Sequence, residues 1–382
     1  MTQTLAARAR RIIALTAGIT VGNAGGNVMP VLLDGFGERF TLTPSMAGLI
    51  AGGQLLATAI CTLGFTRRAA RPGRVRLIRV GFLIGALGMI ASWLSMDEWM
   101  LLGASILAGS SLGLVFAAAS AALSACDDVD RATTLTVLFS TIVTAVLILA
   151  IPLVNGIGGG TAGFAVLAGC CLLGVLLAGP LPEIAADEVR GGSRPGLVLL
   201  GAIVLFGVVE QGAWSYAGQF GQQNAGFDTD EVSVVLAVAA AAALAGVGLA
   251  ELGRRLAGPR VALAAVLVIG TVAKALVVLP PNAGVFAIAA TVWQICYLAT
   301  LVLVLAAAGR RESSGRWVAA SAGSLALGTA FGPVVIGYAL EHFGAVTVCA
   351  GIVGIVTVAA GPLVGLSSAS APELAPEPAP EN

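Results

Sequence analysis

Long apolar segments, separated by short polar connections, dominate the chain. Twelve of them lie at about 11–33, 45–65, 77–96, 99–125, 132–155, 161–180, 197–221, 230–252, 261–279, 283–308, 316–340 and 345–366. A helix of roughly 20 apolar residues crosses the hydrocarbon core of a bilayer, about 30 Å thick. The segments are too long for barrel strands and lack the alternation that such strands need. The pattern therefore predicts an all-α membrane protein with twelve transmembrane helices.

One sizeable polar stretch, "LPEIAADEVRGGSRP" at 181–195, interrupts this pattern in the middle. It predicts a cytoplasmic linker between two pseudo-symmetric six-helix bundles, an N-terminal one at 1–180 and a C-terminal one at 196–366. The last residues, 367–382, are rich in Pro, Ala and Glu and poor in apolar side chains. Such composition is typical of a disordered segment, so we expect a disordered cytoplasmic tail.

Composition agrees with lipid as the solvent, because 58% of the residues are hydrophobic and only 10% are charged. Soluble domains carry about 25% charged residues. The formal net charge is zero, and no basic patch interleaved with aromatics indicates a nucleic-acid partner. The sequence contains no Walker motif, no Ser/His/Asp arrangement and no metal-ligand spacing. We therefore expect no cofactor and no metal, and neither ATP-driven transport nor enzymatic catalysis has support.

The basic residues predict how the chain sits in the membrane. Eighteen of the 20 lie at the termini or in every second connection; of the other two, Arg39 lies on the opposite side and Lys274 inside a segment. Cytoplasmic loops carry an excess of Lys and Arg. We therefore expect a multi-pass protein of the plasma or inner membrane, with both termini in the cytoplasm.

The two halves of the chain echo each other. "TRRAARPGRVRLI" follows the second segment and "GRRLAGPRVALA" follows the eighth, which places Arg67-Arg68 and Arg254-Arg255 187 residues apart. Pro152 and Pro333 are 181 residues apart. Parallel six-helix repeats are a transporter architecture.

On these features the chain resembles the major facilitator superfamily over nearly its full length. The family's loop after helix 2 reads roughly G-x-L-A-D-R-x-G-R-R, and here it reads "GFTRRAARPGR". The glycine and the basic cluster match, whereas Arg68 stands near the place of the aspartate. The resemblance implies gating by the basic loops. The residues concerned are Arg67, Arg68, Arg71, Arg74, Arg254 and Arg255, with Glu251 supplying an acid in the second copy.

Ionisable groups inside membrane segments are costly, by about 2.5–3.5 kcal/mol on insertion scales, and they mark candidate functional sites. Glu210 lies near the centre of its segment, with Gln211 beside it and Trp214 one helical turn on. Glu210 is either a proton carrier facing substrate or a protonated carboxyl that bonds a neighbouring helix. Lys274 is expected to extend its long stem to the membrane interface. Asp34, at the outer end of the first segment, is a second candidate for proton coupling, with a solvated loop acid as the alternative.

The resemblance implies a central cavity lined by helices 1, 4, 7 and 10. Neutral amides and aromatics at mid-membrane depth then make up the candidate substrate site. The residues are Asn23, Asn27, Gln54, Glu210, Gln211, Trp214, Trp293, Gln294 and Tyr297. For each residue alone, hydrogen bonding between helices is an equally good interpretation.

The sequence therefore favours a monomeric secondary transporter that moves a neutral or cationic small organic molecule by alternating access, coupled to protons. The resemblance favours export over import. Three alternatives remain: an uptake symporter, a transporter-like sensor or scaffold that binds without turnover, and a membrane enzyme.

Overall fold

The computed structural model describes residues 5–183, 195–311 and 316–367. All regular structure in these ranges is helical. The helices are α1 (Leu5–Asn27), α2 (Met29–Phe40), α3 (Pro44–Ala69), α4 (Arg74–Trp93), α5 (Glu98–Ser124), α6 (Val129–Gly158), α7 (Gly163–Leu177), α8 (Leu197–Ser215), α9 (Ala217–Ala225), α10 (Thr229–Ala242), α11 (Ala245–Val278), α12 (Ala283–Arg311) and α13 (Arg316–Leu366). The predicted linker, apart from its ends, and nearly all of the predicted tail lie outside the described residues.

Polar side chains in the connections define where several helices begin. Thr43 accepts a hydrogen bond from the backbone N–H of Met46 at the start of α3, and Asp97 does the same for the start of α5. At the start of α10, Asp228 and Glu231 form a reciprocal capping box. Each cap satisfies N–H groups that have no partner within the helix. The short polar connections in the sequence therefore also position the apolar helices.

Two of the helices are longer than one membrane crossing and contain a break. The 51 residues of α13 would extend about 77 Å as one straight helix, and Gly344 divides them with a φ of 76°. In α11 the break is at Gly258, with a φ of 80°, directly before Pro259. Glycine adopts positive φ without the steric cost of a side chain. Both breaks fall between segments that the sequence analysis separates.

Among the described residues, eight helices are long and apolar enough to span a membrane, or nine when the bent pair α1–α2 is taken as one span. The count of twelve depends on including the shorter α7, on dividing α11 and α13 at their breaks, and on taking α10 with the first part of α11 as one span. It therefore stays a prediction, whereas the all-helical membrane fold is confirmed.

The first predicted segment differs from expectation. The apolar pattern predicts one helix over 11–33, but α1 ends at Asn27 and α2 starts at Met29, with a bend of 51° between them. Pro30 is the physical reason, because its ring nitrogen carries no hydrogen for the carbonyl four residues earlier. The second helix then continues to Phe40, seven residues beyond the expected end.

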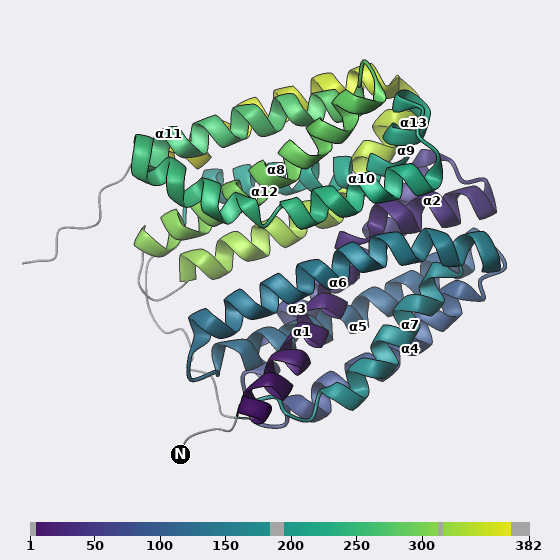
Figure 1. Cartoon of the computed structure of the whole chain (residues 1–382), viewed down its shortest axis with the longest axis vertical. Coiled ribbons are helices and arrows are strands. Elements are labelled where there is room, and N and C mark those ends of the chain that lie inside the picture. Colours follow the sequence, from purple (N-terminus) through teal and green to yellow (C-terminus); the bar gives the residue numbers. More distant parts are fainter. Residues whose placement is uncertain (1–4, 184–194, 312–315, 368–382) are drawn as a thin grey trace, which may run out of the picture.

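The helices gather into two groups that follow the chain order (Figure 1). One group contains α1 and α3–α7, and the other contains α8 and α10–α13. At the end where α2 and α9 lie together, hydrogen bonds join the groups: Ser45 N–H donates to Glu341 (2.9 Å), and the Tyr216 hydroxyl donates to the Pro44 carbonyl (2.7 Å). This is the end that the basic-residue pattern places outside the cell.

Candidate functional site

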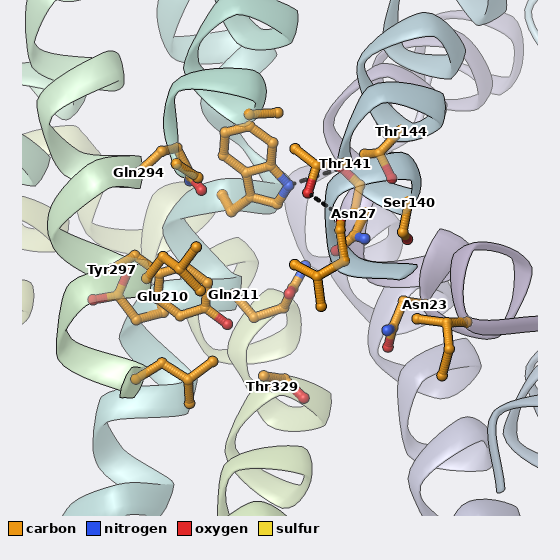
Figure 2. Close-up of a pocket in the computed structure, with 17 residues that line it drawn as sticks. Asn23, Asn27, Ser140, Thr141, Thr144, Glu210, Gln211, Gln294, Tyr297 and Thr329 are labelled. Atoms are coloured by element: carbon orange, nitrogen blue, oxygen red, sulfur yellow. Dashed lines mark hydrogen bonds between the residues drawn. The ribbon is translucent and has the colours of Figure 1, made fainter. Parts of the chain in front are cut away.

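A cavity of about 330 Å³ lies between the two helix groups. Figure 2 shows Asn23, Ser140 and Thr144 on one side of it and Gln294 and Tyr297 on the other. The lining residues come from both halves of the chain, namely Ile19, Asn23, Asn27, Val137, Ser140, Thr141, Thr144, Glu210, Gln211, Trp214, Ala240, Ala243, Gln294, Tyr297, Leu298, Leu301 and Thr329. The polar groups among these lining residues are mostly carboxamides and hydroxyls. Glu210 is the one Asp, Glu, Lys or Arg side chain among them.

Glu210 is held by two partners on the side away from the cavity. The Lys274 Nζ lies 2.5 Å from Oε1, and the Trp293 indole N–H donates to Oε2 at 2.6 Å. Glu210 is 5% exposed and Lys274 only 2%. The Lys274 ammonium also lies 5.8 Å and 5.9 Å from the ring centres of Trp293 and Phe206, within the range of cation–π attraction. Both oxygens of the carboxylate are therefore paired although the group is nearly dehydrated.

The expectation that Lys274 extends to the membrane interface is wrong. Its ammonium points inward from α11 and pairs with Glu210 of α8, 64 positions earlier in the chain. A buried cation needs a nearby anion to offset its dehydration, and among the described residues Glu210 is the carboxylate that supplies it. The two charges that looked independent in the sequence therefore form one net-neutral unit.

The break between α1 and α2 is linked to α8 through backbone carbonyls. Because Pro30 has no N–H, the Gly26 carbonyl lacks its usual helical donor, and the Gln211 side chain donates to it instead (3.1 Å). One turn along α8, the Trp214 indole N–H donates to the Asn27 carbonyl (3.0 Å; Figure 2). The two residues that follow Glu210 on the cavity wall thus connect the N-terminal half to the C-terminal half.

Seven of the nine predicted substrate-site residues line the cavity. The other two do not. Trp293 lies behind Glu210, with its ring edge-on to Trp214 at 5.9 Å. Gln54 is 1% exposed and packs against α1 near Gly25, away from the cavity. Trp293 and Gln54 therefore pack behind the cavity wall, against Glu210 and Gly25 respectively, and do not form part of its surface.

Asp34 lies within α2 and contacts the other half of the chain. Its Oδ2 accepts a hydrogen bond from the Gln222 amide of α9 (3.1 Å), and the backbone of Gly218 passes so close that a side chain there would collide with the carboxylate. Asp34 is absent from the cavity wall. It is neither a solvated loop acid nor a neighbour of Glu210, but part of the contact between α2 and α9.

Sequence reasoning missed the hydroxyl groups of the cavity. Ser140, Thr141 and Thr144 of α6, and Thr329 of α13, all line it. Ser and Thr bond readily to their own helix backbone, as Thr141 does to the Val137 carbonyl (2.9 Å), so isolated hydroxyls are common in membrane helices. The spacing of 140, 141 and 144 on one helical face was the available signal.

The two basic loops differ in their surroundings. Arg74 is fully buried and donates to the carbonyls of Ala121 (2.7 Å) and Ala70 (3.2 Å), while Arg68 donates to Pro72 (3.0 Å). In the second copy, Glu251 pairs with Arg254 (2.8 Å) and Arg255 (2.5 Å) on its own exposed helix turn.

No group of three or more His, Cys, Asp or Glu side chains with metal-binding geometry occurs in the part of the chain that the structure describes.

Comparison with known proteins agrees with this geometry. A profile of the Major Facilitator Superfamily matches residues 14–314, so the chain belongs to this superfamily and is a multi-pass membrane protein with the transporter fold. No curated protein sequence matches it.

Three groups of solved structures show how closely the fold agrees. A mutant form of the nucleoside transporter NupG is 12% identical, with a TM-score of 0.76 over 94% of this chain and 99% of that one. A bacterial homologue of the human lysosomal transporter Spinster, inward-facing and unoccupied, is 16% identical, with a TM-score of 0.72 over 96% and 98%. The peptide transporter POT with sulfate is 12% identical, with a TM-score of 0.71 over 94% and 93%. At these identities the likeness concerns the fold alone.

Proposed function

We propose that the protein is a secondary active transporter that carries a small, neutral, polar organic molecule through the cavity between its two halves. The observation that supports this most directly is the cavity wall, where amides and hydroxyls come from both halves and the one carboxylate among the lining residues, Glu210, is paired with Lys274 behind it. A cavity of about 330 Å³ is at the lower end of the range for small-molecule sites. Movement of one half against the other would expose such a site to each side in turn.

The chemistry of the wall favours a neutral ligand. The sequence alone left a cation open because Glu210 had no visible partner, but Lys274 now neutralises that carboxylate. Asn23, Gln211 and Gln294 each offer both hydrogen-bond donors and acceptors. The rings of Trp214 and Tyr297 add apolar faces. A molecule with a flat, weakly polar part and several hydroxyl or amide groups fits this set, and nucleosides are a suitable first panel.

The ion pair also changes how proton coupling would operate. Protonation of Glu210 in this conformation would leave Lys274 as a buried cation without a counter-charge, which is strongly unfavourable. We infer that Glu210 takes up a proton only when movement of the two halves has separated it from Lys274. Because Glu210 borders the cavity and Lys274 lies behind it, the separated carboxylate would face the cavity, where a proton can reach it.

Reconstitution in proteoliposomes tests both the transport of a neutral solute and its coupling to protons. Radiolabelled nucleosides and other neutral polar solutes should exchange across the bilayer, and a pH gradient should drive their accumulation. Binding without any flux would contradict the transporter and favour the sensor. When the outside of the vesicles is the acidic side, the direction in which the solute accumulates distinguishes import by symport from the export that the sequence resemblance favours.

Charge variants test the role of the pair. In Glu210→Gln/Lys274→Met both charges are absent, so no unpaired charge is left in the membrane. We expect this double variant to fold and to catalyse downhill exchange, but to lose pH-driven accumulation. If it accumulates substrate as well as the wild type does, the pair is a structural contact and proton coupling through Glu210 is wrong.

A further inference from the structure

A second hollow lies at the cytoplasmic ends of α1 and α6, outside the central cavity. Its volume is about 560 Å³. Arg8 and Arg11 of α1 and Arg131 of α6 line it, together with the turn of Cys126, Asp127 and Asp128. In the sequence these arginines serve only to orient the chain, and the proposed transport cycle does not involve them.

An apolar groove of about 330 Å³ lies next to this hollow, along the membrane-facing side of α1, α6 and α7. Ile13 and Phe139 line both spaces, so the groove adjoins the hollow. Ile13 is 50% exposed, Phe139 44% and Leu173 of α7 54%, which places the groove on the surface that meets lipid.

The groove is separate from the transport cavity. Between α1 and α6, the Thr20 hydroxyl donates to the Ser140 hydroxyl at 2.9 Å, and both side chains are buried. Ser140 faces the central cavity, whereas Thr20 lines the groove. This contact forms a partition, so the groove opens to the bilayer rather than to the substrate pathway.

The hollow carries an excess of positive charge. Its two acids already have partners, because Asp127 pairs with Arg11 (3.6 Å) and Asp128 accepts the backbone N–H of Arg131 at the start of α6 (3.1 Å). Within the described ranges, the guanidinium groups of Arg8 and Arg131 form no ion pair. Guanidinium groups bind phosphate oxygens through paired, charge-assisted hydrogen bonds. The cytoplasmic leaflet, where these arginines are expected, is the one that carries anionic lipids.

We propose that this hollow and groove together bind one anionic phospholipid molecule. The phosphate lies between Arg8 and Arg131, and one acyl chain follows the groove past Phe139 toward Leu147 and Leu173. The apolar groove selects a lipid over free phosphate, because only a lipid fills both spaces. The bound lipid then fills the space between α1, α6 and α7, three helices of the N-terminal half.

Native mass spectrometry of the full chain with added phosphatidylglycerol tests the proposal, with phosphatidylcholine as the neutral comparison. We expect one phosphatidylglycerol to remain bound under conditions that remove phosphatidylcholine. In the double variant Arg8→Gln/Arg131→Gln, its affinity should fall about tenfold or more, because both guanidinium contacts to the phosphate are lost. The matched control is Arg260→Gln/Arg310→Gln, which removes two exposed charges from the same predicted side of the other half and should leave binding unchanged.

A third variant, Val143→Trp, fills the groove and leaves the arginines in place. Val143 is 38% exposed toward lipid, so the larger ring can be accommodated, and a melting curve confirms folding. Phosphatidylglycerol affinity should fall here as well. Equal binding of both lipids, an equal effect of the control pair, or competition by inorganic phosphate as effective as by lipid would each overturn the proposal.

Discussion

Two carboxylates in the C-terminal half lie at the same distance from a basic side chain, in opposite surroundings. Glu210 Oε1 is 2.5 Å from Lys274, and Glu251 Oε1 is 2.5 Å from Arg255. The first pair is 5% and 3% exposed at its side chains, and the second is 42% and 70% exposed. The first joins two helices, whereas the second joins neighbouring turns of one helix.

The distance between the charges therefore does not by itself determine how much an ion pair contributes to stability. In water, a short pair gains little because solvent already stabilises both charges. In a buried site each charge has lost its water, so the intact pair adds only modestly to the free energy of unfolding. Removing one partner is severely destabilising, because the other charge stays buried without a counter-charge. The buried pair restricts which sequences fold, and the exposed pair hardly does.

The largest effect is expected from breaking the buried pair on one side. Lys274→Met leaves Glu210 charged in a dehydrated site, which costs about 3–5 kcal/mol. We expect a marked fall in the melting temperature of the purified protein, measured by intrinsic fluorescence. The double variant with Glu210→Gln should recover most of that loss. If the double variant is as unstable as Lys274→Met, packing of the lysine stem, and not the pair, is what matters.

Arg74 tests the same idea for a buried cation whose guanidinium is held by backbone carbonyls. Its guanidinium is buried and donates to the carbonyls of Ala121 and Ala70, joining the start of α4 to the end of α5. Arg74→Gln should destabilise the protein by about 1–3 kcal/mol, because the carbonyls lose their donors. Arg76→Gln, an exposed neighbour on the same helix, is the control and should melt like the wild type.

Glu183 is an intermediate case, an exposed carboxylate held by backbone groups. It accepts hydrogen bonds from the N–H groups of Gly73 and Val75 (2.8 Å for Val75) at the start of α4. Partial burial acts to raise its pKa, but these N–H groups and that of Arg74, helped by the Arg74 charge, hold the pKa below the usual value of 4.5.

The sign of the pH dependence follows from that lowered pKa. The contribution of Glu183 is fully present above pH 4.5 and is lost as the pH falls through the lower pKa of the folded protein. Wild type should therefore lose about 0.3–1 kcal/mol of stability on acidification that Glu183→Gln does not lose. Parallel melting curves of the two proteins between neutral and acidic pH measure this, and identical slopes would contradict it.

The smallest effect is expected at the exposed pair. Glu251→Gln should leave the melting temperature unchanged, since Arg254 and Arg255 remain hydrated without it. Transport rate is the informative measurement here, because the sequence resemblance implies a gating role for this loop. A slower rate at unchanged stability supports gating, whereas a clear loss of stability would contradict the contrast between the two pairs.

Much of the fold was predictable because it follows from local chemistry. The apolar runs, the capping residue Asp97 and the break at Gly258–Pro259 act within a few residues of their own position. The bend before Pro30 was also visible in the sequence, in "GNAGGNVMP", but the apolar pattern continues through it and hides it. Hydrophobic pattern indicates what lies in lipid, and not whether the helix inside it is continuous.

The candidate site was predictable only in part, since it depends on contacts between helices. Asn23, Gln211 and Gln294 were found because an amide in an apolar helix is conspicuous. The partnership of Glu210 with Lys274 was not, because it requires the rotation and packing of α8 against α11. Trp293 and Gln294 are adjacent in sequence, yet only the second reaches the cavity. The rotation of a helix about its own axis, to within one residue, cannot be predicted from a single sequence.

The missing hydrogen on Pro30 also affects how the protein can vary. The links from Gln211 and Trp214 end on main-chain carbonyls of Gly26 and Asn27, which every amino acid possesses. Side chains on the α1 face of the cavity can therefore change without breaking the connection between the halves. A lineage could alter its substrate by mutation at Asn23 or Asn27 while the joint beside it keeps working.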